Sequence, residues 1–595
     1  MSENQGTRQL GTVHVWEKVE ITLRAQNTYS NPYTEVEVWV DLKGPGFDKR
    51  VYGFWDGEAI FRVRVLATGS GEWLWVSGSN QADDGLNGRT GGFRAKEWTE
   101  SEKQANPNRR GFLRATANGH ALEYADGTPC FLLGDTWWAT PTFRHRWYDD
   151  DVERPIGPGM GFKDMVRFRK AQGYNCIAMI AGFPHWANDG KSRRIRLDDE
   201  EQTVVRSAWQ QAGTESAKDM HNEGGRPFLF PGRVPGNEDL FPDVDRINPA
   251  YFEYMDRKID YLNAQGFVPF IEVARRDISQ AWKRFYDWPE SYARYIQYVW
   301  SRCQANSCIL SPIHFDSGHM SIPSRDYNEP ANMVVEKGVP AFGTLLSCNA
   351  SGSSLTNFGD SDEARWLTLH QIGNRRHHNS HWLLTEIYHE SVPPRPALNG
   401  EPYYDVLGRP RDVGWPPHAI PGTEETALYC RSAMYGSFLS GGFAGHIYGA
   451  AGLWGGDIEP DADYKMWDAL HWESGAQMQH LGTFAFSEGA RYRDLVPNAD
   501  LICPNKTHVI TGNLGWAYCA RTPERDLFML YFEAECPQAT VRGALYERTY
   551  RGQWFNPRTG KWSDAGSLAS DSLCEIKLPP LPSGKDWGLK LVLEE

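Results

Sequence analysis

Residues 131–135 read Phe131-Leu132-Leu133-Gly134-Asp135, an apolar run that ends on a carboxylate. Seven further short runs follow it, at residues 175–180, 267–273, 308–315, 342–347, 353–358 (a weak run), 382–386 and 443–448. Continuous apolar runs are typical of strands that are buried on both faces, as in parallel sheets. The chain therefore carries eight candidate strands of this kind.

The segments between these runs have helical periodicity. Phe252, Met255, Ile259 and Leu262 lie on one face of a helix that we expect to end at Gly266. The next helical layer is predicted from Trp282, Phe285, Tyr292, Tyr295 and Val299. Strands that alternate with helices predict a (β/α)8 barrel of the TIM type, although residues 348–355 leave no room for a fifth helix.

Both ends of the chain are predicted to form strands without helices. Residues 36–40, 60–65 and 72–76 alternate apolar and polar side chains, and further strands are expected at 527–532, 553–562 and 587–593. We therefore predict a multidomain protein of the α/β plus all-β class. Its parts are an N-terminal immunoglobulin-like β-sandwich (1–98), a linker (99–110), the barrel (111–490) and a C-terminal β-sandwich (491–595).

Composition argues against several classes of function. The 595 residues carry 62 Lys and Arg against 76 Asp and Glu, a net charge of −14, with no basic run for binding nucleic acid. No apolar run is long enough to cross a membrane. Residues 1–10 are polar, unlike a secretory signal, and the ten Cys lack CxxC spacing. These features predict a cytoplasmic protein, and they do not indicate its oligomeric state.

Three acidic residues stand where predicted strands end, namely Asp135, Asp316 and Glu386. A carboxylate beside a buried strand costs desolvation free energy unless it is paired or functional. Glycoside hydrolysis needs two carboxyl groups, one as proton donor and one as nucleophile or base. Asp316 after the fourth strand and Glu386 at the end of the seventh would face each other across the barrel mouth. The alternative is that each carboxylate caps a helix or pairs with a nearby Arg.

Four segments together form a recognisable pattern: residues 131–138, the strand ending at Asp316, Leu384-Thr385-Glu386, and 445–449. They resemble the apiosidase-like glycoside hydrolases, glycoside hydrolase family 140 and its uncharacterised relatives. The resemblance implies a barrel with accessory sandwiches, a carbohydrate substrate, Asp316 as the acid/base and Glu386 as the nucleophile. It also implies that the Gly-Asp-Thr segment at 134–136 and the Gly-His-x-Tyr-Gly segment at 445–449 form the floor of the pocket.

The sequence departs from the family pattern beside both presumed catalytic groups. The family usually has Gly-Gly-Asp around its acid and Gly-Glu-Pro around its nucleophile. This chain has His314-Phe315-Asp316 and Thr385-Glu386-Ile387 at the corresponding places. These changes bear on which sugar is cleaved more than on the class of reaction. We expect a divergent relative that need not cleave apiosides.

The predicted reaction is exo-acting, retaining hydrolysis of an oligosaccharide derived from a plant or algal polysaccharide. Glu386 would attack the anomeric carbon while Asp316 protonates the leaving oxygen and later activates water. For that cycle the pKa of Asp316 must be raised while Glu386 stays ionised. Exo action is suggested by long connections that follow strands, at 182–249, 387–421 and 449–461, and that could close a pocket.

Further residues are expected to line the pocket. Asp135 could accept hydrogen bonds from sugar hydroxyls or instead hold the first strand–helix turn. Only one of Trp137 and Trp138 can face the pocket, because neighbours on a strand alternate. Arg275 or Arg276 could bind the carboxylate of a uronate or pair with an Asp. The other candidate binding residues are Trp186, His314, Tyr388, His446, Tyr448 and Trp454.

Neither a cofactor nor a metal is expected. His377, His378 and His381 lie close together, but the chain has no HExxH motif, and a solvated helix end explains them. Two other functions remain open. The chain could be a non-catalytic carbohydrate-binding protein on a degenerate barrel, which would bind glycan without releasing reducing ends. The C-terminal sandwich could also be a protein-adhesion module.

Overall fold

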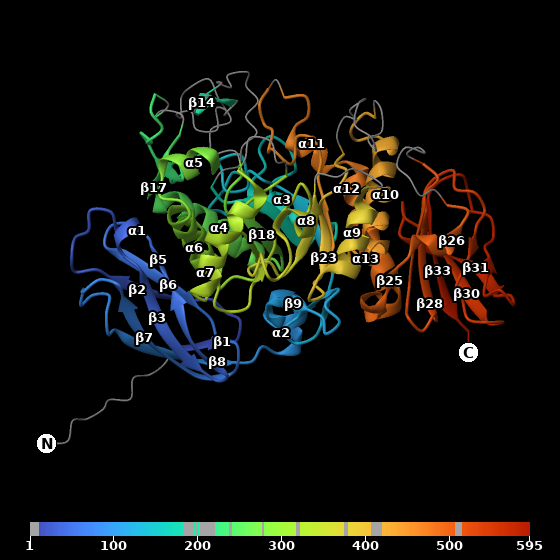
Figure 1. Ribbon diagram of the computed structural model, residues 1–595, viewed down its shortest axis with the longest axis horizontal. Coiled ribbons are helices and arrows are strands. Elements are labelled where there is room, and N and C mark those ends of the chain that lie inside the picture. Colours follow the sequence, from blue (N-terminus) through green and yellow to red (C-terminus); the bar gives the residue numbers. More distant parts are fainter. Residues whose placement is uncertain are drawn as a thin grey trace.

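The computed structural model describes residues 11–182, 195–197, 200–202, 221–236, 238, 241–276, 279–316, 322–373, 379–405, 419–460, 462–505 and 514–594. Three groups of sheets follow one another along the chain (Figure 1). The N-terminal sheets lie at one end of the molecule and the C-terminal sheets at the other. The central sheet and its helices lie between them.

The first group, which we call the N-terminal sheet pair, consists of two sheets that share one apolar core. In β3, Val38, Val40 and Leu42 are buried while Asp41 and Lys43 are exposed, so the predicted period of two is confirmed. The first sheet runs β1 (Gly11–His14), β8 (Thr90–Lys96), β7 (Gly71–Ser79), β3 (Val38–Gly44), β4 (Phe47–Tyr52), and the second β2 (Val19–Arg24), β6 (Ile60–Val65), β5 (Phe54–Trp55). Helix α1 (Pro32–Glu35) joins them, and α2 (Glu100–Ala105), β9 (Leu113–Ala115), β10 (Leu122–Tyr124) and β11 (Pro129–Cys130) lead into the central sheet.

Within the described residues the central sheet has nine strands, and all neighbours pair in parallel except β21 with β22. In order they are β20 (Leu345–Leu346), β19 (Ile309–Ser311), β18 (Val268–Glu272), β13 (Cys176–Ile180), β12 (Leu132–Thr136), β24 (Gly445–Tyr448), β23 (Ala397–Glu401), β22 (His370–Gly373) and β21 (Gly352–Ser353). Leu346 O accepts hydrogen bonds from Thr368 N at 2.9 Å and Leu369 N at 3.0 Å, so β20 and the start of β22 approach each other. The sheet is therefore curled, which fits a barrel. We call the carboxyl ends of its strands the mouth.

Helices cover the outside of the curled sheet (Figure 1). They are α3 (Phe162–Ala171), α4 (Pro249–Ala264), α5 (Ser279–Phe285), α6 (Glu290–Cys303), α7 (Asn328–Glu336), α8 (Ser354–Phe358), α9 (Asn379–Glu390), α10 (Glu424–Leu439), α11 (Met466–Leu470), α12 (Glu473–Ala476) and α13 (Met478–Ala485). The helices predicted around Phe252 and Tyr295 are confirmed as α4 and α6. Two short hairpins are β14 (Ile195–Leu197) with β15 (Glu200–Gln202) and β16 (Phe228–Leu229) with β17 (Asp243–Ile247). In the described part of the chain, no helix has the length and apolar composition needed to span a membrane.

Six of the eight predicted central strands are confirmed, and two are wrong. Residues 353–358 form β21 and α8, and residues 382–386 lie within α9. That helix buries Leu384 and Ile387, three positions apart, against the neighbouring strands. The sixth and seventh parallel strands are β22 and β23 instead. Their sequences, His-Gln-Ile-Gly and Ala-Leu-Asn-Gly-Glu, are too polar to stand out as apolar runs.

The C-terminal group also consists of two sheets around one apolar core. One runs β25 (Val496–Pro497), β27 (Ala517–Arg521), β28 (Leu527–Phe532), β33 (Trp587–Leu593), β30 (Thr549–Asn556), β31 (Lys561–Ala569), and the other β26 (Ile502–Cys503), β29 (Thr540–Val541), β32 (Ile576–Lys577). The strands predicted at 527–532 and 587–593, and the hairpin predicted across 553–562, are confirmed.

A buried ion-pair network fastens the N-terminal sheet pair to the helices of the central sheet. Arg302 on α6 is completely buried and donates hydrogen bonds to Asp56 at 2.8 Å and to Asp256 on α4 at 2.6 Å. Arg64 on β6 donates to the same Asp256 at 2.7 Å and to the backbone carbonyl of Arg302 at 2.8 Å. Burial opposes ionisation of Asp256, but Arg302 and Arg64 outweigh it and lower its pKa to about 2.

We expect Arg302→Met to lower the free energy of unfolding by about 3–5 kcal/mol, since it leaves buried carboxylates without their cation. Urea denaturation of the full chain measures this. Arg551→Met, which removes an exposed pair with Asp564, is the matched control and should cost only about 0–1 kcal/mol. Equal losses from both substitutions would contradict the importance of the buried network.

Candidate functional site

Polar side chains gather at the mouth, where several parallel strands end. Glu272 is the last residue of β18, and Asp316 lies just past the end of β19. Asn349 follows β20, and Glu401 ends β23. All four are buried, between 0% and 9% exposed. Because parallel strands bring their carboxyl ends to one edge of a sheet, residues far apart in the sequence meet here.

Asp316 is held by cations that come from the end of the neighbouring strand. Arg275 donates a hydrogen bond to its Oδ2 at 2.9 Å, and Arg276 donates to its Oδ1. The ring nitrogen Nε2 of His314 lies 3.7 Å from Oδ2. Burial opposes ionisation, but Arg275, His314 and Arg276 outweigh it and hold the pKa of Asp316 well below its usual range. The expectation that its pKa is raised is therefore wrong.

His314 links Asp316 to a second carboxylate. Its Nδ1 is hydrogen-bonded to Glu272. Burial disfavours the charged imidazole, but Glu272 and Asp316 on its two sides outweigh this and raise the pKa of His314 to about 10. Burial raises the pKa of Glu272, and His314 and the Asn349 backbone amide only partly offset this. The charged imidazole therefore carries a proton on each ring nitrogen, with Nδ1 toward Glu272 and Nε2 toward Asp316.

Glu401 is the acidic residue that faces Asp316. An oxygen of Glu401, an oxygen of Asp316 and a ring nitrogen of His314 all lie within 4.8 Å of one another. Asn349 Nδ2 donates to Glu401 Oε2 at 3.2 Å. A Cβ on Gly400 would lie 1.8 Å from the amide oxygen of Gln371, so only glycine fits beside Glu401 without moving that buried side chain. Glu401 was not predicted from the sequence, although residues 400–402 read Gly-Glu-Pro, the triplet expected around the nucleophile.

Glu386 lies elsewhere. It is half-buried on α9 and not at a strand end. Its neighbour Thr385 donates a hydrogen bond to the backbone carbonyl of Ser440 at 3.2 Å, just before β24 begins. This part of α9 therefore packs beside the amino ends of the strands, opposite the mouth. The predicted pairing of Glu386 with Asp316 across the mouth is contradicted.

Two predicted aromatic residues do lie at the mouth. Trp138 packs edge-on against His314, with ring centroids 4.6 Å apart, and its side chain belongs to the apolar cluster inside the curled sheet. Trp454, on the loop after β24, packs against the same cluster, and its carbonyl accepts a hydrogen bond from Trp138 N at 3.2 Å. Trp137 instead packs in the layer between sheet and helices, as alternation requires.

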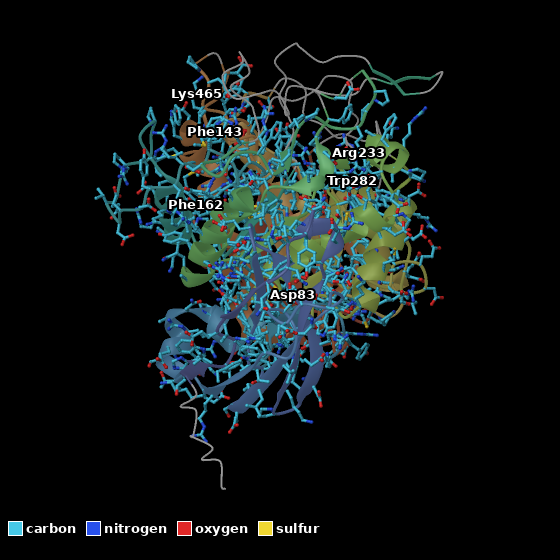
Figure 2. All side chains as sticks on the ribbon, turned by 90° about the vertical axis from the view of Figure 1, so that its left-hand side faces the viewer. Asp83, Phe143, Phe162, Arg233, Trp282 and Lys465 are labelled. Carbon is cyan, nitrogen blue, oxygen red and sulfur yellow. The ribbon has the colours of Figure 1, made fainter. Side chains whose placement is uncertain are left out.

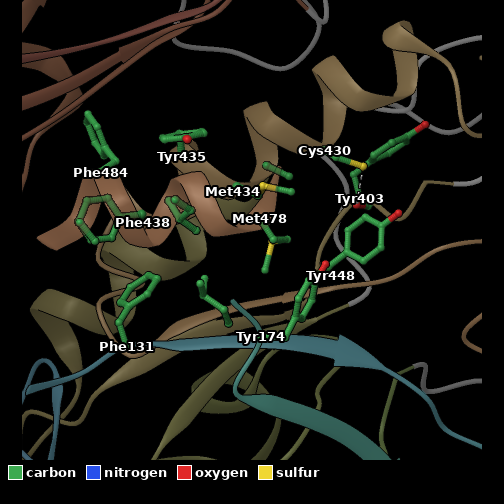
Figure 3. Packing of buried hydrophobic residues seen from close by; sticks show 14 of the residues in the cluster. Phe131, Tyr174, Tyr403, Cys430, Met434, Tyr435, Phe438, Tyr448, Met478 and Phe484 are labelled. Carbon is green, nitrogen blue, oxygen red and sulfur yellow. Dashed lines mark hydrogen bonds between the residues drawn. The ribbon is translucent and has the colours of Figure 1, made fainter. Parts of the chain in front are cut away.

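Three residues of the expected pocket floor point outward, toward the helices. Asp135 is fully buried and accepts hydrogen bonds from Arg169 of α3 at 2.6 Å and from Trp137 Nε1 at 2.9 Å. Tyr448 lies in the packed layer between sheet and helices (Figure 3), where its hydroxyl meets Ser474 at 2.8 Å. His446 shares the outward face, and burial lowers its pKa to about 3. For these residues the structural alternative holds.

The remaining predicted residues do not join the mouth. Tyr388 lies on α9, where its ring stacks on His120 at 3.9 Å and meets Phe443 just before β24. Trp186 lies outside the described residues. Of the three clustered histidines, two also lie outside them, and His381 lies on α9 with its ring 5.7 Å from that of Trp516.

His314, Asp316 and Glu401 could in principle offer three ligand atoms to a metal ion. Their surroundings fit a cation poorly. Arg275 and Arg276 already bring two positive charges to Asp316, and a His314 that carries a proton on each ring nitrogen has no lone pair to donate. The donor set therefore fits a carboxyl pair with its own positive partners.

Three family models match parts of this chain. Residues 116–489 match the family model "Apiosidase-like, catalytic domain", residues 12–80 a "Domain of unknown function (DUF5060)" and residues 496–594 a "Putative collagen-binding domain of a collagenase". No curated protein matches this chain.

Two crystal structures from Bacteroides vulgatus ATCC 8482 share the fold. One, assigned as a glycoside hydrolase, has a TM-score of 0.66 and 15% identity over 98% of this chain and 100% of its own. The other, a glycoside hydrolase of family 5, has a TM-score of 0.56 and 17% identity over 82% of this chain and 94% of its own. The apiosidase-like model covers well over half of the residues. The chain therefore belongs to the apiosidase-like family of glycoside hydrolases.

Proposed function

We propose that this glycosidase cleaves its substrate at the mouth, with Glu401 and Asp316 as the catalytic pair. The observation that carries the proposal is their approach to within 4.8 Å, from opposite sides of the curled sheet. Carboxyl groups about 5–5.5 Å apart favour retention of configuration, because no room is left for water between acid and base. The supporting architecture would be a (β/α)8 barrel (111–490), with β-sandwiches at 1–98 and 491–595 and a linker at 99–110.

Glu401 would act as the nucleophile. Its carboxylate forms a bond to the anomeric carbon while the glycosidic C–O bond breaks and the leaving oxygen takes a proton through Asp316. Water then attacks the anomeric carbon, gives its proton to Asp316 and releases Glu401. The Gly-Glu-Pro triplet and the position at the end of the seventh parallel strand support this role for Glu401.

The proton for the leaving group would be stored on His314. Asp316 is ionised, and the imidazole beside it carries the opposite charge and is backed by Glu272. A sugar oxygen that enters next to Asp316 takes space from the guanidinium groups of Arg275 and Arg276. Weaker contact with these cations raises the proton affinity of Asp316, so the proton can pass from His314 to Asp316 and on to the leaving oxygen.

The substrate would be a short oligosaccharide bound at its end, with Trp138 and Trp454 as apolar walls and Arg275 able to meet a sugar carboxylate. A panel of aryl glycosides and plant and algal oligosaccharides, with the product anomer followed by NMR, tests the proposal. Release of the anomer with retained configuration is expected. Inverted product would contradict the roles given to the pair, and glycan binding without release of reducing ends would select the non-catalytic alternative.

Storage of the proton on His314 predicts a specific dependence of activity on pH. We expect kcat/KM to fall as pH rises through about 10, because above this value His314 loses its proton. Glu272→Gln removes the anion that holds the proton on His314, so this alkaline limb should move to lower pH. Initial rates over a wide pH range measure it. Glu386→Gln, a change in a glutamate far from the mouth, is the control. An alkaline limb of kcat/KM that stays at the same pH in Glu272→Gln would contradict storage of the proton on His314.

A further inference from the structure

The N-terminal sheet pair contains a hollow of about 620 Å³ that is remote from the mouth in the chain and in the fold. It opens between β2 of one sheet and the first residues of β8 in the other. Strand β1 pairs with β8 only from Phe93 onward, and β2 pairs only with β6 among the described strands. Two strand edges therefore border the hollow, and Gly91 and Gly92 contribute no side chains that would fill it.

The indole of Trp75 lines the hollow. This ring lies directly over Gly91, where an added Cβ would be 2.3 Å from Cζ2. Trp75 is half-buried, and within the described part of the chain its ring meets no other aromatic ring and no cation. A second tryptophan on the opposite face of the same sheet differs in this respect. Trp39 lies over Gly78 in the same way, but the Arg50 guanidinium covers it 4.3 Å from the ring centroid.

Two unpaired cations stand at the rim. Arg24 and Arg89 line the hollow, and both are exposed. Neither has an acidic group within ion-pair distance among the described residues. The nearby buried acid, Asp83 (Figure 2), is already satisfied by the backbone amides of Gln26, Asn27 and Gly85 and by the Tyr29 hydroxyl. These partners are uncharged, so Asp83 keeps its negative charge and offsets one of the two positive charges at the rim. The remaining positive charge stands in a chain whose net charge is −14.

We propose that this hollow is a second carbohydrate-binding site, and that it takes an acidic oligosaccharide such as a uronate segment. The half-buried indole of Trp75 lines the hollow and can meet the apolar face of a sugar ring, and the two guanidinium groups match ring carboxylates by charge-assisted hydrogen bonds. A volume of about 620 Å³ lies within the range of sites that enclose a small ligand. The site goes beyond hydrolysis at the mouth, because it would keep an acidic polymer close to the enzyme whatever bond the mouth cleaves.

Isothermal titration calorimetry tests the proposal on the full chain carrying Glu401→Gln, with tetragalacturonic acid as the acidic probe and cellotetraose as the neutral one. Binding at the mouth is then the same in every variant compared, so failure of the proposed hydrolysis does not alter the outcome. We expect Trp75→Ala to weaken binding of the acidic probe about tenfold. Arg24→Gln with Arg89→Gln should weaken the acidic probe similarly and leave the neutral one unchanged.

Trp39→Ala is the matched control, because it removes a tryptophan from the other face of the same sheet. It should leave binding unchanged. Thermal unfolding of each variant separates lost binding from lost folding, and the two exposed Arg substitutions are expected to keep the native Tm. No binding of the acidic probe by the parent, or equal binding by the parent and both hollow variants, would overturn the proposal.

Discussion

Glu401→Gln is expected to lower kcat by about a thousandfold or more, whereas Glu386→Gln should leave kcat unchanged. The amide keeps the size of the side chain and can still accept a hydrogen bond from Asn349 Nδ2, so the site stays assembled. It cannot form the ester bond to the anomeric carbon. Glu386 lies on α9 beside the amino ends of the strands, too far from the mouth to take part.

Turnover of an activated aryl glycoside measures both variants. A small external nucleophile sharpens the test. Azide should restore part of the rate in Glu401→Ala and give a glycosyl azide of inverted configuration, because it replaces the missing carboxylate. Full activity in Glu401→Gln together with loss in Glu386→Gln would restore the assignment made from the sequence and contradict the one made from the structure.

The difference between Glu386 and Glu401 shows what apolar runs can predict. Strands such as β12, β13 and β18 are buried on both faces and stand out in the sequence. Strands β22 and β23 each carry an amide side chain, and β23 ends on a carboxylate at the mouth, so their composition is polar. The apolar run at 382–386 belongs to a helix face. A search for hydrophobic strands therefore fails at the strands that bear the chemistry, and a short motif such as Gly-Glu-Pro is a better guide there.

The direction of each side chain was equally hard to predict. In a strand that is apolar on both faces, the sequence does not distinguish the inside of the curled sheet from the side under the helices. Asp135, His446 and Tyr448 were expected in the pocket, yet they pack toward the helices. Asp316 was placed at the mouth because it follows a strand, and a residue past a strand end escapes this ambiguity.

Asp316→Asn is expected to lower kcat by about a hundredfold to ten-thousandfold on natural oligosaccharides, the usual range for loss of general acid–base catalysis. The loss of rate in the first step should be smaller for leaving groups of lower pKa, because a nitrophenolate departs without a proton. With such substrates the slow step is attack of water on the glycosyl-enzyme intermediate, because the variant lacks the carboxylate that would act as the base. A burst of phenolate followed by slow turnover is therefore expected, and stopped-flow absorbance measures it.

The surroundings of Asp316 make this test specific. The Asp316→Asn substitution removes the charge that faces Arg275, Arg276 and His314. If this carboxylate has only a structural role, the variant should lose stability, and its activity should fall by the same factor with every substrate. Asp135→Asn is the control for that outcome, since it breaks an equally buried pair with Arg169 on the outward face. It should lower stability and show no burst. If Asp316→Asn likewise shows no dependence on the leaving group, the carboxylate only anchors the two arginines, and the acid must be sought elsewhere at the mouth.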